Sequence, residues 1–230
     1  MTAIDHRSGY LRSHEVGGEG PFEGSELLWR VGALAERREP GVLSAARLRD
    51  ADAATVERIF RAEDETVGGA AGRAELWRDL AVGLERAYDG SAAALLAACE
   101  GRLGGKGGLL GRLAGFEAFS DPLQKKAFLF AKIAERRGWL DVSDPESWEV
   151  CADNVLMRLA LRSGLVEQGG RDEVRSATRS AFKRVADRTG VSPPVLDDLL
   201  WELGRDDPDL LGTAAGDLRE PERDPDSHWY

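Results

Sequence analysis

Three side chains near the middle of the chain have types and spacing that could do chemistry. Lys125 and Lys126 open one helical pattern, and Asp153 stands directly before another. A carboxylate at a helix start is stabilised by free backbone amides and by the helix dipole, so Asp153 can stay ionised inside a cleft. An ionised carboxylate there suits a reaction in which the substrate develops positive charge, such as cleavage of an N-glycosidic bond.

The expected catalytic residues are Asp153 and Lys125. Loss of a base from a ribose passes through an oxocarbenium-like state, the electronic problem that glycosidases also face. Asp153 would stabilise that charge, or orient and deprotonate the attacking water. Lys125 would pair with a 5′-phosphate or with Asp153, or, if it lies close to C1′, act as a Schiff-base nucleophile. This chemistry implies no cofactor.

Substrate binding would need cations for a phosphate and an aromatic platform for the base. Arg158 and Arg162 are one helical turn apart and share a face. The predicted substrate-binding residues are the cations Lys126, Arg158, Arg162 and Arg175, together with His228 and the aromatic residues Phe60, Trp201, Trp229 and Tyr230.

Other kinds of site find no support in the sequence. The three histidines include no pair at metal-ligand spacing, so we predict no metal centre. The glycines at 104–108 do not match GxxxxGK(S/T), and no hydrophobic strand precedes them, so they predict a surface turn. No Gly-x-Ser-x-Gly motif occurs. Cys99 and Cys151 are too few for a four-thiolate cluster and predict buried thiols in a reducing compartment.

Charge is distributed unevenly along the chain. The formal net charge of −10 argues against broad electrostatic binding to duplex DNA. Residues 101–138 nevertheless carry eight Lys and Arg against three acids, and residues 158–190 carry eight against four. A locally basic middle in an acidic protein suits one or a few phosphates better than a long polyanion. Solvated helix faces would explain the same composition.

The elements that must position these residues are helices. Apolar residues recur at helical spacing through most of the chain, and the alternation that marks strands is almost absent. The candidate N-caps are Asp52, Ser91, Asp153, Asp172 and Ser192, and the candidate helix ends are Gly164 and Gly190. We therefore predict an all-α protein, a compact helical bundle.

Composition divides the chain into three parts. Residues 1–24 are rich in Gly and polar residues without periodicity, which predicts a flexible N-terminal segment. Residues 25–203 form the predicted helical domain. Residues 204–230 form an acidic tail whose aromatic end suggests docking back onto the domain. No apolar run approaches the ~20 residues of a membrane span and no signal peptide is recognisable, so we expect a cytoplasmic protein without membrane partners, of undetermined oligomeric state.

The middle of the chain resembles the helix-hairpin-helix DNA glycosylases. In that family a hairpin is followed by a Lys-x-Ala at a helix start and by an Asp that opens a helix of the form D-x-x-V-x-R-x-x-x-R-x-G. The matching residues are Leu113-Ala114-Gly115-Phe116, Lys125-Lys126-Ala127, and Asp153 with Arg158, Arg162 and Gly164. The hairpin lacks the usual Pro and has Glu117 in place of its second Gly.

A longer part of the chain, roughly 43–230, is similar to the queuosine salvage proteins, which are queuosine 5′-phosphate N-glycosylases on a related helical scaffold. The similar segments follow in the same order and are 56–60, 125–127, 152–154, 173–175, 196–201 and the aromatic C-terminus after a His. The resemblance implies that Asp153 is the catalytic carboxylate and that the substrate is a modified nucleoside or nucleotide of the 7-deazaguanine type. The base-binding segment after Phe60 is poorly matched, which leaves the base open.

Three functions follow from the residues and from this resemblance. The first is an N-glycosidase that hydrolyses a modified nucleoside or nucleotide. The second is a DNA glycosylase that flips a modified or damaged base out of DNA, which would require residues 101–138 and 158–190 to converge on one basic face. The third is a non-catalytic helical interaction protein, which an Asp153 without an open cleft beside it would favour.

Overall fold

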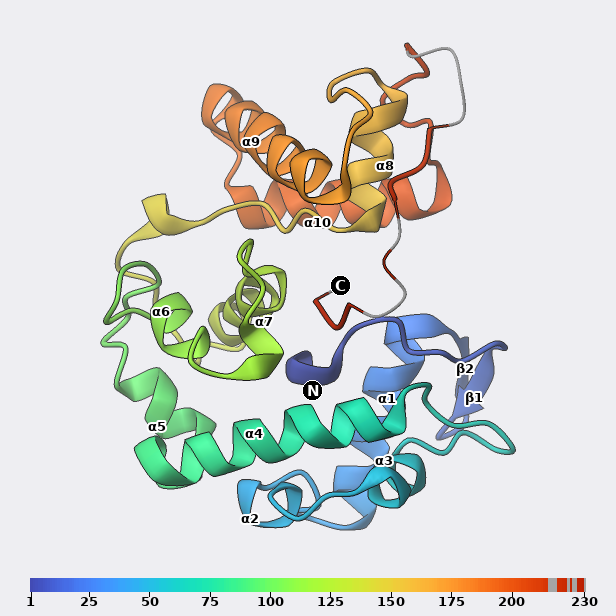
Figure 1. The fold of residues 1–230 in the computed structure, drawn as a ribbon, viewed down its shortest axis with the longest axis vertical. Helices are drawn as coiled ribbons and strands as arrows, with labels where there is room; N and C mark the ends of the chain where they lie inside the picture. The colour runs from blue at the N-terminus through green and yellow to red at the C-terminus, as the bar shows by residue number, and fades with distance from the viewer. Residues whose placement is uncertain (215–218, 223, 225–226, 230) are drawn as a thin grey trace.

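The protein is mainly helical. The computed structural model describes residues 1–214, 219–222, 224 and 227–229. Within these residues lie ten α-helices, three short 3-10 helices and one two-stranded antiparallel sheet (Figure 1). The predicted all-α class is confirmed.

The α-helices are α1 (Gly24–Arg38), α2 (Ala45–Leu48), α3 (Ala53–Ile59), α4 (Ala70–Tyr88), α5 (Ala92–Ala97), α6 (Leu109–Leu113), α7 (Lys125–Arg136), α8 (Asn154–Arg162), α9 (Arg171–Thr189) and α10 (Pro193–Asp206). The 3-10 helices are η1 (Thr2–Ile4), η2 (Glu117–Phe119) and η3 (Pro145–Ser147), and the strands are β1 (His14–Val16) and β2 (Glu19–Phe22).

Short polar side chains start several helices where the sequence predicts a cap. Asp52 accepts a hydrogen bond from the Thr55 backbone N–H at 2.8 Å, and Ser91 accepts one from Ala94 at 3.3 Å. Each bond satisfies a donor that the first helical turn leaves free. Asp172 is not a cap, because α9 begins before it and places it in the first turn.

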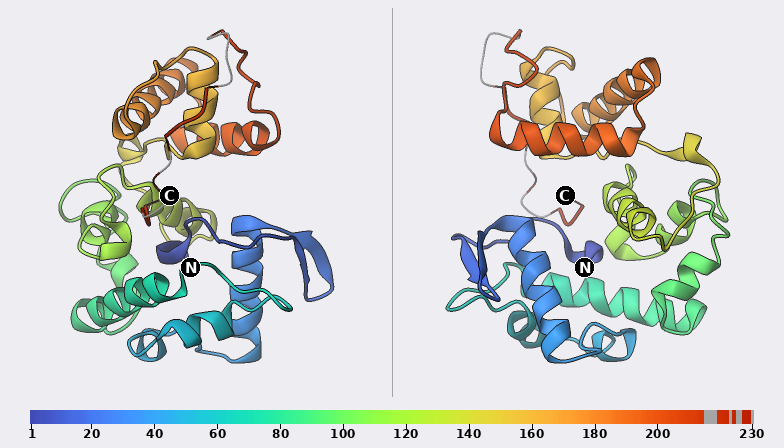
Figure 2. Two further views of the ribbon diagram at one scale, coloured as in Figure 1. Left: turned by 45° about the vertical axis from the view of Figure 1, so that its right-hand side comes forward. Right: turned by 180° about the vertical axis from the view of Figure 1, so that it is seen from behind.

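Two hydrophobic cores give the molecule two lobes. The first lobe runs from η1 to η3 around a core that includes Leu27 and Trp77. The second lobe, α8 to α10, packs around Leu156 and Phe182. Figures 1 and 2 show this second lobe as a separate layer, joined to the first by the segment after α7. Gly204 lets α10 pack closely on α8, since a Cβ there would lie 2.5 Å from Leu159 Cδ1.

The N-terminal segment contradicts the expectation of a flexible 1–24. Ile4 is completely buried, and residues 14–22 form the β1–β2 hairpin. Arg73 of α4 is also buried and donates to the carbonyl oxygens of Ile4, His6 and Arg7. One arginine thus satisfies a run of irregular backbone that would otherwise need water. Periodicity cannot signal an ordered segment of this kind.

His14 joins the hairpin to the loop after α3. Its side chain is buried, with Nε2 2.7 Å from Glu65 Oε2 and Nδ1 3.4 Å from Glu63 Oε2. The hydrogen bond to Glu65 raises the pKa of His14 above its ordinary value of 6.5, and this effect outweighs the opposing effect of burial. The contact with Glu65 therefore stabilises the charged form of His14.

This raised pKa predicts how stability depends on pH. The ion pair contributes fully below the pKa of His14 in the unfolded chain, near 6.5, and its contribution disappears as pH rises through the higher folded-state pKa. We expect His14→Gln to lower the free energy of unfolding most near pH ~6 and least near pH ~9. Urea titrations of both proteins across this range measure the difference; an equal loss at every pH would contradict the assignment.

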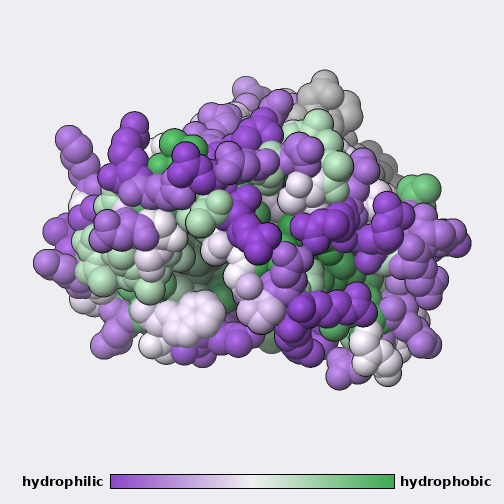
Figure 3. Space-filling model, turned by 90° about the horizontal axis from the view of Figure 1, so that it is seen from below, coloured by the Kyte–Doolittle hydropathy of each residue, from purple (hydrophilic) through white to green (hydrophobic). Residues whose placement is uncertain are grey.

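Among the described residues, no helix is long and apolar enough to cross a bilayer. Viewed from below, the surface is mostly hydrophilic, and hydrophobic residues show in its recesses and at some points of its outer surface (Figure 3).

Candidate functional site

A cleft of about 460 Å³ is lined by residues of both lobes. Its size is within the range of pockets that hold small molecules. From the first lobe it is lined by Asp5, His6, Arg7, Ser25, Trp29, Lys125, Leu129, Lys132, Ile133 and Cys151. From the second lobe it is lined by Asp153, Asn154 and Val155 at the start of α8, and by Asp197, Asp198 and Trp201 of α10.

Asp153 caps α8 at the edge of this cleft. Its Oδ1 accepts hydrogen bonds from the backbone N–H groups of Val155, at 2.9 Å, and Leu156, at 3.1 Å. Oδ2 has no hydrogen-bond partner among the described residues. The carboxylate is thus fixed by one oxygen, and the other is available to a substrate or a water molecule.

The pKa of Asp153 is raised, against the expectation that capping alone keeps the group fully ionised. Burial is the largest cause, and the negative charge of Asp197 acts in the same direction. The positive charge of Lys125 and the two capping amides oppose the shift without cancelling it. A carboxylate in this environment is a stronger base than an exposed one, as a group that accepts a proton from water should be.

Lys125 is the first residue of α7 and lines the same cleft. Its backbone N–H donates to Asp121 Oδ2 at 3.1 Å, and Asp121 Oδ1 accepts from Leu123 N–H at 3.0 Å. Asp121 therefore fixes the turn from which Lys125 projects. The two predicted catalytic residues, far apart in sequence, lie in one cleft.

A buried ion pair at the cleft is not predicted by the sequence. Lys132 of α7 pairs with Asp197 of α10, and both are buried. Asp197 also accepts the backbone N–H of Cys151 at 2.9 Å, and Lys132 contacts Asp198 at 2.9 Å. Lys132 lies two turns after Lys125, a spacing that indicates a shared helix face. Its partner Asp197 lies in the second lobe, and no local sequence pattern predicts that the two residues pair.

Cys151 itself is not a nucleophile candidate. It is one of two cysteines that the sequence predicts to be buried thiols, and both are buried and free. Burial, with a contribution from Asp197, raises the pKa of the Cys151 thiol to about 12. The thiol stays protonated at neutral pH, so it packs as an apolar group.

Two tryptophans from different lobes line the cleft. Trp201 of α10 is 39% exposed, and the Arg205 guanidinium lies 5.2 Å from the centre of its ring. Trp29 of α1 is half-buried, and its Nε1 donates to Asp5 Oδ2 at 2.8 Å. Trp201 is a predicted stacking residue. The sequence does not single out Trp29, which lies outside the buried face of α1 formed by Leu27, Leu28 and Val31.

His6 reaches the cleft because the N-terminal segment is ordered. Burial and the positive charges of Lys126 and Arg73 lower the pKa of His6 to about 2, so the ring is neutral. Its Nδ1 lies 3.3 Å from Lys126 Nζ. A neutral imidazole beside a cationic group is a hydrogen-bonding group here rather than an acid.

Two of the predicted binding residues are buried away from the cleft. Lys126 is fully buried, and its Nζ donates to the Ala3 carbonyl at 2.7 Å. Burial, Lys125 and Arg73 lower the pKa of Lys126 to about 7. Phe60 is also fully buried, with its ring centre 5.5 Å from that of Trp77. The structure therefore does not bring Lys126 and Phe60 into the cleft with Asp153.

The three predicted phosphate-binding arginines are engaged elsewhere. Arg158 contacts Glu220 at 2.9 Å, and Arg162 contacts Asp209 at 2.9 Å and Glu220 at 2.7 Å, so both bind the acidic tail. Arg175 is buried and contacts both oxygens of Asp121, at 3.1 and 2.8 Å. None of the three lines the cleft. The sequence gives no sign of these distant carboxylates.

The end of the tail docks on the first lobe. His228 Nε2 lies 3.0 Å from the Glu117 carbonyl oxygen, and Trp229 Nε1 donates to Ser120 Oγ at 3.2 Å. Arg7, which lines the cleft, donates to the carbonyl of Asp224 at 2.9 Å. His228 and Trp229 do not line the cleft, and Tyr230 lies outside the described residues.

Four cations of the two basic stretches are withdrawn from the surface. Lys126, Lys132, Arg162 and Arg175 are buried, and each contacts an acid or a carbonyl oxygen. These four cations cannot contribute to the basic face that a DNA glycosylase would require.

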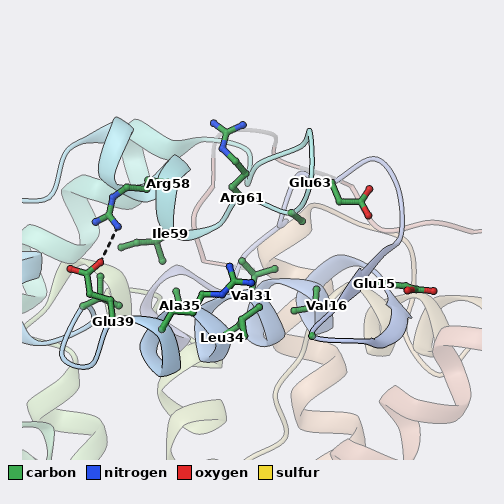
Figure 4. Close-up of a pocket in the computed structure, with 14 residues that line it drawn as sticks. Glu15, Val16, Val31, Leu34, Ala35, Glu39, Arg58, Ile59, Arg61 and Glu63 are labelled. Carbon is green, nitrogen blue, oxygen red and sulfur yellow. Dashed lines mark hydrogen bonds and ion pairs between the residues drawn. The ribbon is translucent and has the colours of Figure 1, made fainter.

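A second hollow, of about 640 Å³, lies between the hairpin, α1 and α3 (Figure 4). Its lining includes the apolar residues Val31, Leu34 and Ile59, and Arg58 at its edge pairs with Glu39 at 3.2 Å. Neither Asp153 nor Lys125 lines it. The two predicted catalytic residues therefore lie in the cleft and not in this second hollow.

A search of the chain against protein-family models and curated proteins finds no match. Within the described residues, no group of three or more His, Cys, Asp or Glu side chains is placed to hold a metal ion.

Proposed function

We propose that the protein is an N-glycosidase that hydrolyses the base–sugar bond of a modified nucleotide in the cleft between its lobes. The observation that carries the proposal is the cap of α8. Asp153 is fixed through Oδ1, has Oδ2 available, and shares a cleft of about 460 Å³ with Lys125 and two tryptophans. An open cleft beside Asp153 also disfavours a purely structural role for this carboxylate.

The reaction needs one carboxylate and one water molecule. The water oxygen forms a bond to C1′ while the bond from C1′ to the base nitrogen breaks, and positive charge develops on the sugar. Asp153 stabilises that charge and accepts a proton from the water. The departing base takes up a proton from solvent, so the products are the free base and the sugar phosphate.

Lys125 gives the site its expected preference for a nucleotide. It lines the cleft beside Asp153, and a lysine ammonium binds phosphate as a point charge. A 5′-phosphate on Lys125 would hold the sugar while Asp153 acts at C1′. We expect Lys125→Ala to raise KM for the monophosphate and to leave the slower reaction of the nucleoside nearly unchanged.

The tryptophans are assigned to the base. Stacking on an aromatic side chain contributes ~1–3 kcal/mol per base, so Trp201→Ala should raise KM by about 10-fold. Trp201→Phe keeps a ring and should recover most of the affinity. Initial rates across nucleotide concentrations measure both variants; a KM unchanged by Trp201→Ala would remove this residue from the site.

Chromatographic detection of released base tests the proposed function. The substrates are a 7-deazaguanine nucleoside, its 5′-monophosphate and guanosine 5′-monophosphate. Release from the modified monophosphate is the expected result. Absence of release from every substrate would overturn the proposal, and release only from guanosine monophosphate would overturn the assignment of the base.

A further inference from the structure

A surface groove adjoins the cleft. It has a volume of about 400 Å³ and lies along α1, between the β1–β2 hairpin and the end of α7. Trp29 lines both the cleft and this hollow. We name it the cationic groove, after Arg30, Arg37 and Arg137 in its lining.

Two helices run from the cleft into the cationic groove. On α1, residues at four-residue spacing pass from Trp29, at the cleft, to Ala33 and Arg37, in the groove. On α7, the same spacing leads from Ile133, which lines the cleft, to Arg137 just past the helix end. At about 1.5 Å per residue, Arg37 lies roughly 12 Å along α1 from Trp29. A mononucleotide bound in the cleft would not reach it.

Only one of the three cations of the cationic groove is compensated by acids. Arg30 contacts Glu19, the one acid in the lining, at 3.1 Å and Glu26 at 3.8 Å. The side chains of Arg37 and Arg137 form no ion pair or hydrogen bond with any described residue. Two positive charges are therefore available to anions of a ligand that extends out of the cleft.

Aromatic rings lie beside two of these cations. Arg30 lies 4.5 Å from the centre of the Phe22 ring, and Arg137 lies 5.9 Å from that of Trp139, which is 59% exposed. Trp29 stands at the entrance to the cleft. Basic groups interleaved with exposed rings bind single-stranded nucleic acids, in which phosphates meet the cations and unpaired bases stack on the rings.

We propose that the cationic groove binds a single-stranded polynucleotide and that one nucleotide of this strand enters the cleft. A single strand fits because its bases are free to stack, whereas a duplex would need a broader basic surface on a protein of net charge −10. Only the entry of a nucleotide into the cleft rests on the proposed function; binding in the groove is independent of it.

Fluorescence anisotropy tests the groove without turnover. The probes are fluorescein-labelled decamers of thymidylate and of uridylate, and the protein is the Asp153→Asn variant. Removing both groove cations, with Arg37→Ala and Arg137→Ala together, should weaken binding about tenfold. Each phosphate contact contributes ~0.7 to the slope of log affinity against log salt, so the slope should fall by about 1.4. Arg38→Ala is the matched control, because Arg38 adjoins Arg37 in sequence and lines the other hollow.

The outcomes separate the groove from the chemistry. Decamer binding that weakens in the double variant and persists in Arg38→Ala supports the groove, and equal affinity for both decamers identifies the phosphodiester chain as the recognised group. Failure of the Asp153→Asn protein to bind either decamer, or equal weakening by Arg38→Ala, would overturn it. Arg37 and Arg137 lie outside the cleft, so the wild type and the double variant should release base from a free monophosphate at the same rate. If the wild type releases no base, the proposed function fails, but binding of the decamers in the groove is unaffected.

Discussion

Replacing Asp153 by Asn should lower kcat for base release by about 10²–10⁴-fold, the usual contribution of a positioned general base. Asparagine caps a helix nearly as well as aspartate, so α8 should keep its start and the cleft its shape. The substitution removes the charge that faces the cationic sugar and the basic oxygen that accepts the proton. Initial rates at saturating nucleotide measure the loss.

A second helix cap supplies the control for this substitution. Asp52 caps α3 through the Thr55 backbone N–H and lies outside the cleft, so Asp52→Asn should keep full activity. The wild-type pH profile gives a further check. Since burial raises the pKa of Asp153 above 3.8, kcat/KM should fall on the acid side with an apparent pKa above that value. Full activity in Asp153→Asn would contradict the assigned role.

Replacing Asp121 by Ala should lower the free energy of unfolding by about 3–5 kcal/mol, the typical cost of breaking a buried ion pair by removing one partner. Asp121 and Arg175 are 2% and 1% exposed and share two hydrogen bonds, of 3.1 and 2.8 Å. The substitution leaves the Arg175 guanidinium buried without this carboxylate. It also removes the acceptor for the backbone N–H of Lys125, so activity should fall together with stability.

The pH dependence of this pair has the opposite sign to that of His14. Burial alone would raise the pKa of Asp121. The hydrogen bonds and the charge of Arg175 have the opposite effect and outweigh burial, so the pKa is lowered overall. Its stabilisation is thus present above the unfolded-state pKa of 3.8 and is lost as pH falls through the folded-state value. Urea titrations at neutral pH measure the difference from wild type. Asp64→Ala, at the exposed pair with Arg12, is the control and should change stability little. A loss no larger than in this control would contradict the buried-pair account.

The sequence predicts the helices well because their signals are local. Asp153 opens α8 and Arg162 closes it as expected, and Ser91 and Asp52 also cap where a short polar residue precedes an apolar pattern. The N-terminal hairpin is missed because its strands are three and four residues long. Strands of that length show almost no alternation.

The candidate site is predictable only in part, because burial and distant pairing decide the rest. The two proposed catalytic residues and Trp201 line the cleft. Their positions at helix starts and on a helix face are local features that the sequence predicts. Arg175 and Lys126 look like ligand-binding cations in the sequence, yet they are buried against Asp121 and Ala3. No local pattern shows that a partner lies many residues away. Conversely, Trp29 enters the cleft only because the lobes meet there.

Mass spectrometry of the complete reaction tests the central claim most directly. Wild type and Asp153→Asn are incubated side by side with a 7-deazaguanine ribonucleoside 5′-monophosphate, and free base and ribose phosphate are quantified against time. Equal molar amounts of both products from wild type, and almost none from the variant, are the predicted result. No free base from wild type, or equal release by the variant, would contradict hydrolysis by Asp153.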